Sequence, residues 1–134
     1  MLSKKLLNFT EKEGILFPIN FSDLKFNPKR IFYITNVPKN EIRGKHAHLK
    51  NCQYLICIQG KIKVYLHNGI KESSRLLTPG ISVYVPNLVW DYQEYLTDNS
   101  ILLSLCSEEY NSNDYIHIFD EFKSILRHNK RGKI

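Results

Sequence analysis

Six short strand-like runs follow one another along this chain, and no helical segment separates them. Each run is rich in β-branched and aromatic residues, and Pro, Gly or Asn marks the turns between them. Strands at such regular spacing predict an all-β fold, either an antiparallel barrel or a double-sheet jelly roll. The runs span residues 30–35, 53–58, 62–66, 81–85, 89–95 and 101–106.

A single helix is expected after the last strand, because apolar residues recur there at three- and four-residue steps. We expect this helix to pack on the outside of the barrel. With 134 residues and 43% apolar content, the chain fits one domain, residues 1–134, with a sizeable core. Its basic tail, residues 128–134, is expected to be flexible. The helical face comprises Tyr115, Ile118, Phe119, Phe122 and Leu126, with Ser112 or Asn113 as the cap.

Composition narrows the choice of partners and compartment. The net charge of +6 favours an anionic partner, but no basic-aromatic run or helix-turn-helix pattern indicates nucleic acid, so a phosphate-bearing small molecule fits better. Three cysteines without CxxC spacing indicate reduced thiols in a cytoplasmic protein. No apolar run is long enough to span a bilayer, and the basic start lacks the apolar region and cleavage site of a signal peptide.

Two histidines one residue apart, His46 and His48, form the most distinctive polar pattern. In a strand both side chains point to the same face, and the returning strand can place Gln53 on the same wall. Two imidazoles that converge inside a barrel suit metal binding or general acid–base chemistry. The alternative is a pair of histidines without a functional role, either at the surface or hydrogen-bonded in the core.

The spacing around these histidines resembles the two-part cupin signature, which normally supplies a metal with two His and a Glu, and then with a further His. Here Gln53 occupies the Glu position and Trp90 the last His position. An amide oxygen is a weak ligand for the metals that cupins use, and an indole offers no lone pair. We therefore expect a cupin barrel with no metal and no cofactor. The resemblance rests on Gly44, His46, His48, Gly60, Gly80 and Pro86.

Further residues resemble the sugar-nucleotide 3,4-ketoisomerases, small cupins that act on dTDP-4-keto-6-deoxyglucose. The resemblance extends from about residue 30 to residue 126 and implies an isomerase that moves the keto group from C4 to C3. Its product would supply a C3 aminotransferase in deoxyamino-sugar biosynthesis. The residues concerned are Arg43, Gly44, His46, Ala47, His48, Gly60, Tyr84, Val85, Val89, Trp90, Asn113, Asp114, Tyr115, Ile116, Phe122 and Lys123.

The resemblance also implies a homodimer. Residues 15–19 form an apolar, strand-like segment that we expect to add to a partner's sheet.

By matching positions, His46 is the candidate base at C3, and His48 orients it or shuttles protons. A neutral histidine with an ordinary pKa of about 6.5 can perform both transfers near neutral pH. Arg43 is expected to bind the pyrophosphate or the sugar, because its fork of donors matches phosphate oxygens; a surface arginine at a strand start is the alternative.

Four more residues are candidates for substrate contact. Gln53 is either a polar wall residue that touches substrate or a structural hydrogen-bonding group. Trp90, with Tyr92, is expected to point inward, where it would stack on a base or a sugar, although core packing is the commoner role of such aromatics.

Tyr33 and Asp91 stand where this chain departs from its relatives, which commonly have two tyrosines at Phe32–Tyr33 and a histidine at Asp91. Strand alternation turns Tyr33 to the face opposite Phe32. These departures leave open which group protonates C4, and therefore the C4 configuration of the product.

Two other functions remain open at this stage. One is a dTDP-sugar 3,5-epimerase, which uses a similar barrel but typically a longer chain with a His–Asp pair. The other is a non-catalytic cupin that binds a nucleotide sugar.

Overall fold

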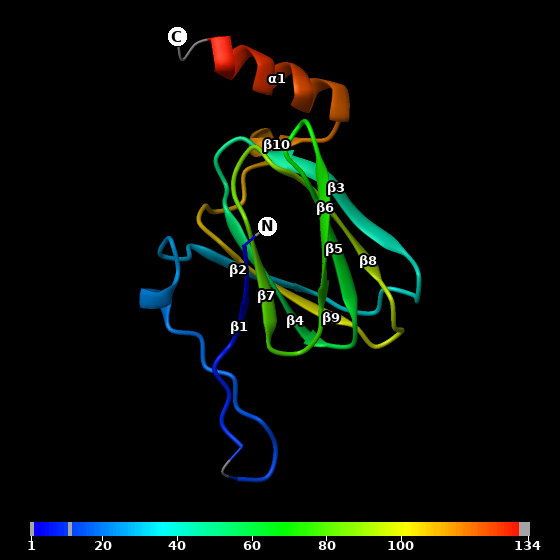
Figure 1. Ribbon diagram of the computed structural model, residues 1–134. Coiled ribbons are helices and arrows are strands. Elements are labelled where there is room, and N and C mark those ends of the chain that lie inside the picture. The colour runs from blue at the N-terminus through cyan, green and yellow to red at the C-terminus, as the bar shows by residue number, and fades with distance from the viewer. Residues whose placement is uncertain (1, 11, 132–134) are drawn as a thin grey trace.

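The computed structural model describes residues 2–10 and 12–131, and its two antiparallel sheets face each other as a sandwich (Figure 1). This arrangement confirms the expected jelly-roll fold. The first sheet has the order β1 (Leu2–Lys5), β7 (Ile81–Val85), β4 (Gln53–Gln59), β9 (Ile101–Cys106), β2 (Arg30–Ile34). The second has the order β10 (Tyr115–Ile116), β3 (Ile42–His48), β8 (Trp90–Tyr95), β5 (Ile62–His67), β6 (Glu72–Leu77).

The main core lies between the two sheets and is built from alternate residues of the central strands. Val64, Val83 and Cys57 are fully buried there, and Leu55 and Leu102 are almost so. This period-two burial is what the sequence pattern of β4, β5 and β7 predicts. The six expected strands are all present. Two further strands at the sheet edges, β1 and β6, were not expected. Most residues of β6 are polar and exposed, so the strand lacks an apolar alternation.

A second, smaller apolar cluster joins the outer face of the second sheet to the helix α1 (Phe119–Arg131). Phe122 of the helix is fully buried against Ala47, Trp90 and Ile116. The helix therefore lies on the outside of the sandwich, at one end of it, as expected (Figure 1).

The start of this helix differs from the expectation. Tyr115 and Ile116 form the short strand β10, which pairs with His48 and Ala47, so the helix begins only at Phe119. The turn before it is a 3-10 helix, η2 (Ser112–Asp114), and its cap is the Asn111 side chain rather than Ser112 or Asn113. The helix also continues to residue 131, which shortens the expected flexible tail; residues 132–134 lie outside the described part.

The segment that was expected to form an intermolecular strand is part of a long excursion below the sandwich, between β1 and a second 3-10 helix, η1 (Phe21–Asp23) (Figure 1). Leu16 makes a single β-bridge with Phe9, and the described residues between β1 and η1 contain no strand. Ile15 and Leu16 are each about 60% exposed. Among the described residues, no helix has the length and apolarity that crossing a membrane requires.

Candidate active site

A bulge in β3 sets the direction of the candidate catalytic side chains. Gly44 pairs with Tyr92, but His46 pairs with Asp91, so Lys45 is an extra residue. Gly44 and Lys45 both have left-handed backbone angles, with φ of 97° and 65°. A side chain at Gly44 would bring its Cβ within 2.9 Å of the Tyr92 backbone, which explains the glycine.

This bulge leaves the two histidines on the inner face, as the sequence predicted. Their ring centroids are 5.0 Å apart in an edge-on arrangement, and Ala47 between them is buried on the opposite face, under α1. Burial, with smaller contributions from the nearby His48 and His117, lowers the pKa of His46 to about 4. His46 is therefore neutral at pH 7 and able to accept a proton.

His48 is held by a carboxylate. Its Nδ1 lies 3.3 Å from Oδ2 of Asp114, and the backbone amides of Lys50 and Asn51 donate to the same carboxyl group. Burial lowers the pKa of His48, and this effect outweighs the opposite effect of Asp114. In the neutral ring that follows, Nδ1–H donates to Asp114 and Nε2 is left as the acceptor.

Gln53 belongs to a buried hydrogen-bond chain across the interior. Ser104 Oγ donates to Gln53 Oε1 at 3.0 Å, and Gln53 Nε2 donates to Asp91 Oδ2 at 3.4 Å. Gln93 Nε2 donates to the other Asp91 oxygen at 2.6 Å. Asp91 is completely buried, and burial raises its pKa to about 7 although both amides act in the opposite direction. Gln53 and Asp91 are therefore hydrogen-bonded interior residues, and Asp91 lies directly opposite His46 on the neighbouring strand.

The inward orientation expected for Trp90 and Tyr92 is wrong. Asp91 and Gln93 face the interior, so their neighbours in β8 face outward. Trp90 packs against Phe119 and Phe122 of α1, with centroids 5.3 and 5.8 Å away, which is the core-packing role rather than a pocket. Tyr92 stacks on Tyr65 and donates to Glu72.

The two other predicted substrate residues, Tyr33 and Arg43, differ in where they lie relative to the histidines. Tyr33 is 70% exposed on the outer face of β2, so the structure does not bring it to them. Arg43 is exposed. It lies on β3, the strand that carries the two histidines, before the bulge, and it pairs with Gln93 of β8. Without the extra residue, Arg43 and His46 would face opposite sides of the sheet.

Three residues of the site were not anticipated. Tyr115 and His117 flank Ile116. The centroid of the Tyr115 ring lies 4.4 Å from that of His48 and 5.2 Å from that of His46. His117 stacks on Tyr115 at 5.6 Å and meets His46 edge-on at 6.2 Å. Arg30, at the start of β2, completes the group. Period-two alternation around Ile116 was the available signal, but the helical interpretation of this segment concealed it.

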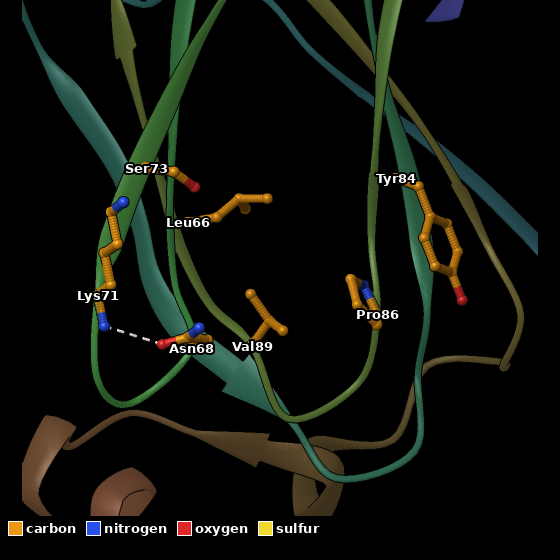
Figure 2. A pocket seen from close by; sticks show the side chains of 7 residues that line it. All are labelled: Leu66, Asn68, Lys71, Ser73, Tyr84, Pro86 and Val89. Atoms are coloured by element: carbon orange, nitrogen blue, oxygen red, sulfur yellow. Dashed lines mark hydrogen bonds between the residues drawn. The ribbon is translucent and has the colours of Figure 1, made fainter. Parts of the chain in front are cut away.

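No group of three or more His, Cys, Asp or Glu side chains suited to a metal ion occurs among the described residues. Two openings near the ends of the sandwich bear on where a ligand could lie. A groove of about 550 Å³ is lined by Lys29, Lys50, Tyr110 and Asp114, next to the carboxylate that holds His48. A smaller cavity of about 200 Å³ lies between β5–β6 and β7, and Leu66, Ser73 and Val89 point into it (Figure 2). None of the residues that line the smaller cavity is one of the candidates.

Comparison with known proteins finds relatives that match nearly the whole chain. A TDP-4-oxo-6-deoxy-α-D-glucose-3,4-oxoisomerase of Aneurinibacillus thermoaerophilus is 32% identical over 130 residues, which cover 93% of this chain and 94% of that protein. The crystal structure of QdtA, a sugar 3,4-ketoisomerase of Thermoanaerobacterium thermosaccharolyticum in complex with TDP, superposes with a TM-score of 0.89. QdtA is 35% identical, and the match covers 96% of this chain and 95% of QdtA.

Another structure holds a QdtA mutant with TDP-4-keto-6-deoxyglucose. The rmlC epimerase of Mycobacterium tuberculosis shares the fold, with a TM-score of 0.74 at 19% identity over 84% of this chain and 66% of its own. The model of the FdtA family (WxcM-like, C-terminal) matches residues 2–127, nearly the whole chain. By this match and by its 32% identity to the oxoisomerase, the chain belongs to the FdtA family.

Proposed function

We propose that this chain, a sugar 3,4-ketoisomerase by its family, converts dTDP-4-keto-6-deoxyglucose to a dTDP-3-keto-6-deoxyhexose without a metal ion. The observation that carries the proposal is the pair His46–His48, both neutral, with His48 buried and His46 half-buried, whose ring centroids lie 5.0 Å apart on the inner face of β3. The product is a 3-keto sugar, which a C3 aminotransferase can consume.

His46 is the base that removes the C3 proton. Its ring is less buried than that of His48, and its lowered pKa keeps it unprotonated at neutral pH. His48 is the partner that orients and relays, because Asp114 fixes its tautomer and leaves Nε2 to accept a proton. The two rings are close enough for a proton to pass between them through the substrate or one water molecule.

Exposed cations lie around the site, although the groove beside Asp114 also carries the carboxylates Glu108 and Glu109. Lys29 and Lys50 are exposed at the groove beside Asp114, and Arg43 is exposed on β3. Exposed cations can meet a diphosphate from solvent without a buried-charge penalty. We retain Arg43 as a contact of the diphosphate or the sugar.

The test is incubation with dTDP-4-keto-6-deoxyglucose in deuterated water, followed by NMR. A 3-keto product with deuterium at the carbons that exchange protons, C3 of the substrate and C4 of the product, supports the proposal. Deuterium at C3 and C5 with inversion would identify a 3,5-epimerase instead. That alternative is kept by one observation, the His48–Asp114 pair. Binding without any exchange would identify a non-catalytic carrier and refute both enzymes.

A further inference from the structure

The guanidinium of Arg30 is fixed at the histidine cluster. Arg30 pairs with Cys106 at the start of β2, and its side chain lies between two aromatic rings. Its Cζ is 5.5 Å from the centroid of Phe32 and 5.6 Å from that of Tyr110. Such stacking restricts the guanidinium without consuming its N–H donors.

This cation has no anionic partner in the described part of the chain. The only ion pairs found there are His48–Asp114 and Lys123–Asp120. Arg30 Nη2 donates to the Cys106 thiol at 3.5 Å, which is a weak acceptor, and the Nε atom is buried with no hydrogen-bond partner. A guanidinium donor buried without an acceptor is costly, so its retention indicates a partner that arrives with the substrate.

The charged and titratable groups that face Arg30 place it at the reacting end of the site. They are Cys106 from β9, His48 from β3 and Tyr115 from β10. The Tyr110 ring beside the guanidinium has its centroid 5.9 Å from that of Tyr115, and the Tyr115 centroid is 4.4 Å from that of His48. The charge of Arg30 also lowers the pKa of His48, in addition to the larger effect of burial. Arg30 therefore acts on the same space as the histidine pair, whereas Lys29 and Lys50 face the outer groove.

We propose that Arg30 is a catalytic residue that binds the substrate oxygen on which negative charge develops. This inference rests on the proposed isomerisation. When the base takes the C3 proton, the C–H electron pair forms the C3–C4 double bond, and a carbonyl electron pair moves onto the C4 oxygen. Transfer of the C3 hydroxyl proton to the C4 oxygen, and return of a proton from the protonated base to carbon C4, then give the C3 ketone and the C4 hydroxyl group.

A fixed cation beside this oxygen stabilises the enediolate and the transition states that lead to it. Arg suits this position better than a histidine or a lysine would. Its charge does not titrate near neutral pH, so it does not compete for the proton that the histidines move. Its planar fork can also hold both vicinal oxygens, on C3 and C4, at the same time.

The test compares Arg30→Gln and Arg30→Lys with the wild type and with Arg75→Gln. Arg75 is an exposed arginine of β6, so its replacement is a control that removes one guanidinium away from the site. We expect Arg30→Gln to lower kcat by about 10²–10³-fold, the usual effect of losing one charge-stabilising donor. The Kd for TDP should stay within about threefold, because the proposal places the sugar oxygens, and no phosphate, at Arg30. Arg30→Lys, which keeps the charge and loses the fork, should be intermediate.

An anionic oxygen of the diphosphate is the other partner that the same chemistry allows. Weaker TDP binding with an unchanged kcat would show a phosphate contact and overturn the proposal, and unchanged values of both would overturn it as well. If Arg30→Gln fails to fold, Arg30→Lys decides by the same criteria, because it preserves the cation between the rings. A wild-type protein that neither converts the sugar nor exchanges its C3 proton would refute the proposed function instead.

Discussion

Replacing Asp91 with asparagine removes a buried carboxyl group whose ionised form is disfavoured by burial. Burial raises the pKa of Asp91 from 3.8 to about 7. Between these two values the folded chain keeps a proton that the unfolded chain releases. The folded state therefore binds more protons there, so the free energy of unfolding falls as pH rises from about 4 to about 7, and this loss is complete above 7.

The size of this effect follows from the two pKa values. A difference of roughly three units corresponds to about 4 kcal/mol when the carboxylate is fully formed. Between pH 5 and pH 8 the pH passes through about two of these three units, from 5 to 7, so the wild type should lose roughly 3 kcal/mol of its free energy of unfolding through this group. An asparagine at this position would have no charge to bury. It could keep both hydrogen bonds if Gln93 turned its amide, since Gln53 is fixed by Ser104.

We therefore expect Asp91→Asn to gain stability relative to the wild type as pH rises. Urea unfolding at pH 5, 6, 7 and 8 measures the difference, and the other titrating groups cancel because both proteins share them. Asp120→Asn is the matched control, because Asp120 is 91% exposed on α1. A difference between Asp91→Asn and wild type that stays constant within about 0.5 kcal/mol over this range would refute the reasoning.

Four further outcomes are expected. His46→Asn lowers kcat by at least 10²-fold with TDP binding within a few-fold, and His48→Asn lowers it less; deuterium uptake at C3 ranks the two, and the reverse order contradicts the assigned roles. The acidic limb of kcat/KM lies near pH 4, because His46 must be deprotonated and burial lowers its pKa to about 4; a limb at pH 6 to 7, as an unperturbed histidine gives, contradicts this. Dialysis against a strong chelator leaves activity unchanged, since Gln53 and Trp90 replace two cupin ligands; a loss that a divalent ion restores argues for a metal enzyme. Light scattering at micromolar concentration gives the mass of two chains, because Leu7, Phe9, Ile15 and Leu16 leave an exposed apolar surface; the mass of one chain refutes the dimer.

The strands and the histidine pair were predictable because both depend on local alternation. The six apolar runs and the common face of His46 and His48 follow from a period of two. The orientation of Trp90 was not predictable in this way. It depends on which residue of β8 lies opposite His46, and that pairing is set by the bulge at Lys45.

The remaining parts of the site depend on contacts that are distant in sequence. Arg30 was missed because its position is defined by Cys106, which is 76 residues away. Tyr115 was assigned to a helix because aromatic residues at positions 115, 119 and 122 also fit a helical period. Only the pairing of Tyr115 with His48 shows that this segment is a strand.

The contact between α1 and Ala47 has a consequence for local opening of the native state. Ala47 is the one residue between the two histidines, and its outer side is sealed by Phe122 of the helix. A terminal helix attached through one small apolar cluster can detach without unfolding the sandwich, as an independent opening unit. Each such detachment would leave the outer face of β3, the strand that carries His46 and His48, without the side chains that pack on it. The amides of α1 and of β10 should therefore exchange with solvent at a common rate, and enlarging the Ala47 side chain should raise that rate for both.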